Sequence, residues 1–494
     1  MRISRLIIFI TFLLAPLVAR ADLEESRSAL SGLAQKVKMY TLPNGLRVIF
    51  YRRGDAPVFA GTVTVRVGGS DEVEGETGIS HMFEHMAFKG THTLGTKDYS
   101  REKPLLDELE IFEAKRVRGE KFSPQEESRY TEVNKELTSL WVTGEFAQQY
   151  EEQGGVGMNA TTDSERTRYF VELPRKAFEF WCAIESMRLR EPVMRQFYKE
   201  RDIVMEERRM RVEDDPPSKL FELLVGVAYL QHRYRNPVIG YSPDIRTLTA
   251  SKVEAFRRAY YVPNNIVLSL VGDVDPERDI ETVRKYFGEI APAAAVVRPG
   301  LVEPAQSGER MVKFEAEANP EVYLAYHKPN YPHRDDAPIT VLSHILAGTQ
   351  IAPLYTELVK KRQVAAAIDV EEGPGMAYPN LLMFSLVPRS PHTNDEVIAA
   401  FDEVLKRSIQ KSLTLEALQI AKRSIAVDYI GQLKSNTTLA LDLASSELFY
   451  GRWQAIVDWY EQAMKVSVED LQRVAAQYIV RTNRTVGVLE SKGK

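Results

Sequence analysis

Cysteine is almost absent from this sequence, which has a single one, Cys182, among 494 residues. One thiol cannot form a disulfide within the chain, so the fold must be stabilised by its hydrophobic core. The chain is long enough to bury a large one. Cys182 lies between Trp181 and Ala183 in an apolar stretch, which favours a buried core cysteine over a catalytic thiol.

Strong charge of either sign is also lacking. The formal net charge is −5 at pH 7, which gives no basic surface of the kind that binds nucleic acid. Hydrophobic residues make up 44% of the chain and charged residues 27%, and this balance is typical of a soluble globular protein.

Long apolar runs are lacking too, except at the start of the chain. The run from Leu6 to Val18 follows a basic segment and precedes Ala19-Arg20-Ala21. It is too short to span a bilayer comfortably, and the pattern is typical of a cleaved signal peptide. We therefore expect a signal peptide over residues 1–21, cleavage after Ala21 and a periplasmic mature chain. A retained N-terminal anchor is the alternative.

Histidine is scarce, with eight in the chain, yet two of them form the pentad His81-Met82-Phe83-Glu84-His85. Positions i and i+4 of a helix share one face, so two imidazoles at this spacing can bind one metal ion. A glutamate beside that ion can accept a proton from water. The alternative is an ordinary amphipathic helix with two surface histidines, which requires a coincidence in so histidine-poor a chain.

A catalytic zinc ion needs a third protein ligand, and a carboxylate on a later helix is the best candidate. The acid-rich segment 200–211 places Glu200 and Glu207 on one helix face, with Val204 between them. One carboxylate can bind the metal while the other orients a ligand from behind. From these residues alone, a charged surface helix is an equally good interpretation.

Two halves are predicted on either side of an alanine- and proline-rich stretch at 291–300. We expect an N-terminal half at 22–295 and a C-terminal half at 296–494. Each half mixes strands and helices without βαβ regularity, which predicts an α+β fold with helices packed on a largely antiparallel sheet. The second half has no H-x-x-E-H sequence and is predicted to be a duplicate without metal ligands.

A charged segment at about 101–150 interrupts the first half and predicts an inserted helical hairpin. A charge-rich stretch is usually a solvated face, and we favour that interpretation. The alternative is a gate or an arm that contacts a partner.

The wider context of the pentad, Gly78 to Thr91, strongly resembles the pitrilysin/insulinase metallopeptidases, whose inverted zinc motif is H-x-x-E-H. Within that family the similarity is greatest to the mitochondrial processing peptidase and its bacterial relatives. Further matches are at 42–46, 159–162, 200–207 and 264–274. The resemblance covers essentially the whole mature chain and is stronger in the first half. It implies two homologous α+β halves per chain, closing with other halves into a clam-shell chamber.

Site roles follow from this resemblance residue by residue. Those that match the zinc ligands of the family are His81, His85 and Glu207. Glu84 matches the general base, and Glu200 matches the glutamate that supports a ligand. Asn159 and Ala160 match the edge strand on which the family binds an extended substrate. The implied function is an exported zinc endopeptidase with one zinc ion per chain, acting on peptides or unfolded polypeptides. The alternative is a non-catalytic binding or scaffold subunit of a processing-peptidase-like complex.

One departure from the family concerns the oxyanion. Active members complete the site with an arginine and a tyrosine, seven residues apart, from a C-terminal half. The matching positions here are Val359 and Ala366, neither of which can donate a hydrogen bond to an oxyanion. Arg362 is nearby but out of register. We therefore expect a homodimer or heterodimer in which a related chain supplies the Arg/Tyr pair.

Overall fold

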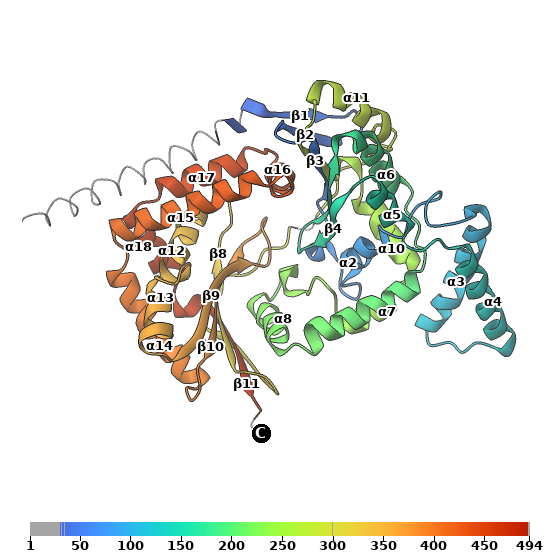
Figure 1. Cartoon of the computed structure of the whole chain (residues 1–494). Coiled ribbons are helices and arrows are strands. Elements are labelled where there is room, and N and C mark those ends of the chain that lie inside the picture. Colours follow the sequence, from blue (N-terminus) through green and yellow to red (C-terminus); the bar gives the residue numbers. More distant parts are fainter. Residues whose placement is uncertain (1–29, 31, 34, 299, 493–494) are drawn as a thin grey trace, which may run out of the picture. The chain divides into compact units, whose positions relative to one another are not determined.

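The computed structural model describes residues 30, 32–33, 35–298 and 300–492. The predicted signal peptide lies outside these residues. The described helices include none that is long and apolar enough to cross a membrane. The chain divides into two compact units (Figure 1). We call residues 38–304 with 447–451 the N-terminal unit, and 305–446 with 452–492 and the described residues before 38 the C-terminal unit.

A six-stranded sheet forms the centre of the N-terminal unit, in the order β1-β2-β6-β3-β5-β4. Its strands are β1 (Val37–Thr41), β2 (Arg47–Arg52), β3 (Val58–Val65), β4 (Val156–Thr162), β5 (Thr167–Pro174) and β6 (Ile266–Gly272). β2 and β6 are parallel, whereas β3 pairs antiparallel with both β6 and β5, and β5 with β4. Every residue of β6 is buried, as expected for a strand in the middle of a sheet.

Helices pack on this sheet through a large hydrophobic core. They are α2 (Ile79–Met86), α6 (Phe178–Arg190), α7 (Phe197–Arg208), α9 (Ser242–Thr247), α10 (Ala250–Tyr260) and α11 (Pro276–Phe287). α8 (Pro216–Ala228) contributes no residue to this core. Trp181 of α6 packs directly on β3 at Gly61, where a Cβ atom would lie 2.6 Å from the indole ring. Cys182 is fully buried beside it, as its apolar surroundings predict.

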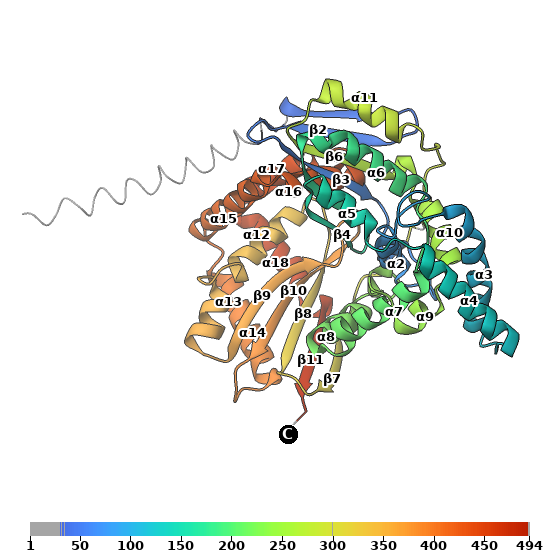
Figure 2. The same ribbon diagram turned by 45° about the vertical axis from the view of Figure 1, so that its right-hand side comes forward.

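The predicted helical hairpin is present in the charged segment (Figure 2). Its helices are α3 (Tyr99–Val117) and α4 (Pro124–Leu140), and α5 (Glu145–Glu152) follows. The hairpin has a small core of its own, formed by Leu105, Leu109, Phe112, Val133, Leu137 and Leu140. Ser123 begins α4 with a capping box that includes Glu126.

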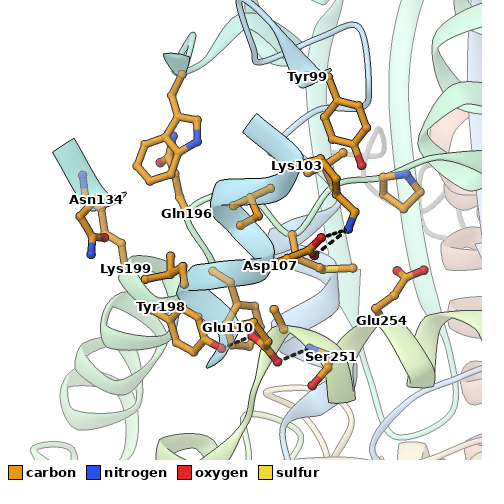
Figure 3. A pocket seen from close by; sticks show the side chains of 18 of the residues that line it. Tyr99, Lys103, Asp107, Glu110, Asn134, Gln196, Tyr198, Lys199, Ser251 and Glu254 are labelled. Carbon is orange, nitrogen blue, oxygen red and sulfur yellow. Dashed lines mark hydrogen bonds and ion pairs between the residues drawn. The ribbon is translucent and has the colours of Figure 1, made fainter. Parts of the chain in front are cut away.

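The hairpin is also attached to the rest of the N-terminal unit (Figure 3). Glu110 of α3 accepts hydrogen bonds from the Tyr198 hydroxyl of α7 and from the Ser251 amide of α10. Arg195, before α7, is fully buried and forms an ion pair with Glu102 at 2.6 Å. A cavity of about 450 Å³ lies where α3 and α4 meet α7 and α10. One face of the hairpin is therefore packed, and only the remainder is the solvated surface that its charge predicts.

The C-terminal unit repeats the strand pairing of the first. Its five strands are β7 (Arg310–Ala316), β8 (Glu321–Lys328), β9 (Ala365–Gly373), β10 (Asn380–Pro388) and β11 (Arg484–Ser491), in the order β7-β11-β8-β10-β9. β7 and β11 are parallel, and the other neighbours are antiparallel. This is the arrangement of β2-β6-β3-β5-β4, so the α+β prediction with two similar halves is confirmed.

Helices of the C-terminal unit also resemble those of the first in their place along the chain. They are α12 (Asp336–Ala347), α13 (Pro353–Tyr355), α14 (Asn394–Lys411), α15 (Leu415–Lys434), α16 (Asn436–Tyr450), α17 (Ala455–Lys465) and α18 (Val468–Tyr478). α12 follows the central strand β8, just as α2 follows β3. A second hydrophobic core joins these helices, apart from α16, to the five-stranded sheet.

Candidate metal centre

The pentad lies on α2, whose N-terminus is held by contacts from outside the helix. Gly78 precedes the helix with φ +86°, and a Cβ atom there would lie 2.5 Å from the Ile239 carbonyl oxygen. The buried carboxylate of Glu72 accepts hydrogen bonds from the amides of Gly78 at 2.7 Å and Ser80 at 2.9 Å. Burial raises the pKa of Glu72 to about 8, although these hydrogen bonds oppose the shift. Glu72 therefore provides the side-chain cap that Gly78 cannot.

One face of α2 is buried and the other carries the polar residues of the pentad. Met82, Phe83 and Met86 pack into the core, while the side chains of His81 and His85 stay 12% and 23% exposed. α2 contacts α7, the helix that carries both predicted carboxylates. The helical spacing of the pentad thus produces the predicted shared face.

His81, His85 and Glu207 converge on one point. Glu207 Oε2 lies 3.8 Å from His81 Nε2 and 3.5 Å from His85 Nε2. One ligand atom from each of the three lies within 4.8 Å of the others. Ligands about 2 Å from a tetrahedral zinc ion lie roughly 3.3 Å apart, so small shifts would complete the geometry. Among the described residues, this is the only group of three or more His, Cys, Asp or Glu side chains placed to hold a metal ion.

The two histidines are supported differently. His85 Nδ1 lies 2.9 Å from Glu200 Oε1, and the other oxygen of Glu200 lies 2.5 Å from Lys89 Nζ. These contacts hold His85 through Nδ1 and leave its Nε2 free to face a metal, with Glu200 behind the ring as predicted. His81 Nδ1 is buried without a hydrogen-bond partner in the described part of the chain.

Burial and charge set different pKa values for the two imidazoles. Burial lowers the pKa of His81 to about 3, with smaller effects from the charges of His85 and Arg211. Its imidazole is therefore neutral, as a metal ligand must be, throughout the physiological range. Burial alone would also lower the pKa of His85, but the Glu200 hydrogen bond and the nearby carboxylates outweigh it and raise that pKa.

Glu84 is held toward the substrate-binding strand expected from the sequence. The hydroxyl of Thr162, on β4, donates a hydrogen bond to Glu84 Oε2. Burial raises the pKa of the Glu84 carboxyl, and the Thr162 hydrogen bond partly opposes this shift. A glutamate with a raised pKa beside a metal-binding group is suited to accept and return a proton.

β4 is an edge strand of the sheet, which is the position predicted for Asn159 and Ala160. Ala160 is buried and Asn159 is exposed, and the Asn159 side chain accepts a hydrogen bond from the Ala160 amide at 2.9 Å. Through Thr162, the same strand reaches the pentad. An edge strand offers unpaired backbone groups to an extended peptide.

The sequence predicts one helix over residues 194–213, and the helix that carries Glu200 and Glu207 differs from this span at both ends. α7 begins at Phe197, because Gln196 takes a left-handed conformation with φ +60°. After Arg208 the chain continues as the π-helical turn η3 (Arg209–Glu213). Such turns inside helices are frequent at functional sites. Glu207 lies two residues before this turn, and its Oε1 forms an ion pair with Arg211 Nη1 at 2.9 Å.

Four site residues were not predicted: Glu72, Lys89, Thr162 and Arg211. Lys89 and Thr162 lie within segments of the sequence that match the family. The match could therefore have indicated them, although it gave neither residue a role. Glu72 and Arg211 act through contacts that no local spacing specifies. The two positions expected to carry the Arg/Tyr pair hold Val359, which is buried in the C-terminal core, and Ala366, which is exposed. Neither side chain can donate a hydrogen bond.

Comparison with known proteins agrees with this geometry. A family model described as insulinase (peptidase family M16) matches residues 48–105, and one described as the peptidase M16 inactive domain matches residues 247–425. The zinc protease PqqE of Helicobacter pylori is 27% identical over 469 residues, covering 92% of this chain and 93% of PqqE.

Solved structures show the same fold. A protease from Helicobacter pylori superposes with a TM-score of 0.78 at 25% identity, over 92% of this chain and 99% of that one. The periplasmic protease PqqL from Escherichia coli superposes with a TM-score of 0.69 at 17% identity, over 92% of this chain and 47% of PqqL. With an M16 model in each half and zinc proteases among its relatives, the chain belongs to the insulinase (M16) family of peptidases.

Proposed function

We propose that this protein is an exported zinc-dependent endopeptidase that hydrolyses peptides or unfolded polypeptides inside a clam-shell chamber. One observation carries the proposal: two histidine nitrogens and a glutamate oxygen from two helices converge beside Glu84, which has a raised pKa. The donor set of two imidazoles and one carboxylate suits zinc, and it leaves a position open for water and substrate.

His81, His85 and Glu207 would hold the ion, with Glu200 and Lys89 orienting His85. Zinc held there would supply the Lewis acid that polarises the scissile carbonyl and makes water a better nucleophile. Glu84 accepts the proton of the attacking water and returns it to the leaving amine. The Thr162 hydrogen bond holds Glu84 in place for both transfers. β4 binds the peptide as an added strand, which presents the scissile bond next to Glu84.

A second chain forms part of this proposal. The oxyanion requires hydrogen-bond donors, and Val359 and Ala366 provide none. We propose that a related chain supplies the Arg/Tyr pair in a heterodimer, because a second copy of this chain would bring the same Val359 and Ala366. Comparing the purified chain with its mixture with that partner tests this, and full activity of a pure homodimer lacking such a pair would contradict it.

Export is proposed from the basic, apolar and Ala-x-Ala pattern of residues 1–21, with cleavage after Ala21. The name of PqqL, a periplasmic protease of the same fold, supports a periplasmic location. The N-terminal sequence of protein purified from the periplasm would test it, and is expected to begin at Asp22.

Catalysis is tested by Glu84→Gln, which keeps the shape of the side chain and removes the base. We expect this variant to retain zinc while hydrolysis of an unstructured peptide falls by about 100-fold or more. Glu206→Gln is the matched control, because Glu206 lies on α7 and points away to Arg209. Unchanged hydrolysis by Glu84→Gln would exclude the mechanism. A zinc-loaded wild-type chain without activity, alone or with its partner, would favour the non-catalytic scaffold alternative.

A further inference from the structure

Three arginines follow Glu207 at the end of α7, and their surroundings differ sharply. Arg208 is buried and binds Glu222 and the Gly240 carbonyl oxygen. Arg209 is tied to Glu206 and Asp214 on the outside of the helix. Arg211 instead contacts Glu207, and its side chain is 71% exposed. Of the three, Arg211 alone presents a solvent-accessible positive charge at the metal centre.

The contact with Glu207 leaves most of the Arg211 guanidinium available. Nη1 lies 2.9 Å from Glu207 Oε1, the oxygen that does not face the histidines. No other described residue is seen to pair with Arg211. A guanidinium has five N–H donors, and the remaining ones can bind a second carboxylate. An ion pair this exposed adds little to the stability of the fold. The main effect of Arg211 is therefore the positive charge that it brings to the candidate metal centre.

Other charges at the site are already compensated. Lys89 is neutralised by Glu200 at 2.5 Å. The negative charges of ionised Glu84 and Glu207 would together balance one divalent ion. Arg211 adds a positive charge that acts on both His81 and Glu84. The loaded site would therefore carry an excess positive charge on its solvent side.

We propose that Arg211 is a specificity-determining residue that favours peptides with an acidic side chain beside the scissile bond. This inference rests on the proposed peptidase function and names the class of substrate that its site selects. A carboxylate at that position of the peptide binds the free guanidinium donors, whereas a lysine there is repelled. Because Arg211 is exposed and screened by water, we expect a moderate preference.

Binding measurements test this without requiring turnover. The zinc-loaded Glu84→Gln chain is titrated with fluorescein-labelled unstructured 12-residue peptides in which one glutamate, glutamine or lysine is moved along the sequence. At one or two adjacent positions, glutamate is expected to bind about two- to fivefold more tightly than glutamine, with lysine weaker than both. The preference should weaken as the salt concentration rises.

The variants Arg211→Gln and Arg211→Glu are then made in the same Glu84→Gln chain. With zinc in excess, Arg211→Gln should remove the preference and Arg211→Glu should reverse it, while the affinity for the glutamine peptides stays within about twofold. Arg209→Gln is the matched control on the same turn and should keep the preference for glutamate.

Two results would overturn the proposal. One is equal affinity for glutamate and glutamine peptides at every position, or a preference that survives in Arg211→Gln. The other is a loss of zinc or of all peptide binding in Arg211→Gln, which would show that Arg211 only positions Glu207. Because binding is measured in an inactive chain, these results stand whether or not the wild-type chain hydrolyses peptides.

Discussion

The two units share a strand arrangement and differ in the helix that follows the central strand. α2 exposes a polar edge with two histidines and a glutamate, whereas ten of the twelve residues of α12 are buried. His344 of α12 has a buried Nε2 without a hydrogen-bond partner in the described chain, and no described carboxylate joins it in a metal-binding group. The proposed metal site thus depends on a partly open helix face with α7 beside it, and the shared sheet alone does not provide it.

Buried charge also serves different purposes in the two units. In the C-terminal unit, Lys328 is 1% exposed and lies 2.6 Å from Asp336, with Glu372 on its other side. Asp336 also accepts a hydrogen bond from the Trp459 indole at 2.9 Å. This cluster ties the end of β8 to α12. In the N-terminal unit, the ion pair of Lys89 and Glu200 instead supports His85 of the candidate metal centre.

The largest contrast is expected between one histidine of each unit. His85→Ala should reduce zinc to background and abolish peptide hydrolysis, because the ion loses one of three protein ligands. His344→Ala should keep full zinc content and activity. Metal analysis of both purified variants checks this. Zinc loss in His344→Ala would show that the comparison between the units is wrong.

A second contrast separates stability from metal binding. Lys328→Met leaves the buried Asp336 and the partly exposed Glu372 without their cation and should lower the free energy of unfolding by about 3–5 kcal/mol. Lys89→Met leaves Glu200 its hydrogen bond to His85, so it should lower stability by less than Lys328→Met, but it should weaken zinc binding about 10- to 100-fold.

Urea unfolding and zinc titration of both variants measure these effects. The distinction fails if Lys328→Met unfolds like the wild-type chain, or if Lys89→Met binds zinc with unchanged affinity.

A pH-dependent effect concerns the cap of α2. The pKa of Glu72 is about 8 in the folded chain and near 4.5 when unfolded, so the folded state holds the proton more tightly. This group therefore makes stability fall as pH rises from about 4.5 to about 8. Glu72→Gln cannot ionise and should lack this decline.

Melting temperatures of wild-type and Glu72→Gln protein across pH 5–8 check the sign. The difference between the variant and the wild type should shift in favour of the variant as pH rises. A constant difference would show that Glu72 does not titrate in this range.

The sequence predicts correctly those parts of the site that depend on the spacing of residues along one helix. The i, i+4 spacing places His81 and His85 on one face, and the i, i+7 spacing does the same for Glu200 and Glu207. The contact of Thr162 with Glu84 joins residues 78 positions apart, and the cap from Glu72 depends on a folded loop. Spacing along the chain carries no information about such contacts.

The inserted segment at 101–150 shows the same limit of prediction from the sequence. Its charged residues and its turn residues predict a helical hairpin with a solvated face, and the hairpin is present. The packed face could not be predicted, because it depends on Glu110 meeting Tyr198 and Ser251 from two distant helices. α7 also begins later than predicted, because Gln196 takes a left-handed conformation. Glutamine rarely does so, and the sequence therefore does not predict it.

The most direct test of the metal centre compares two adjacent glutamates. Zinc per chain is measured by mass spectrometry in wild-type, Glu207→Gln and Glu206→Gln proteins purified and dialysed in parallel. We expect one zinc ion in the wild-type chain and in Glu206→Gln, and almost none in Glu207→Gln. Full zinc content in Glu207→Gln, or a wild-type chain that binds none, would contradict the account.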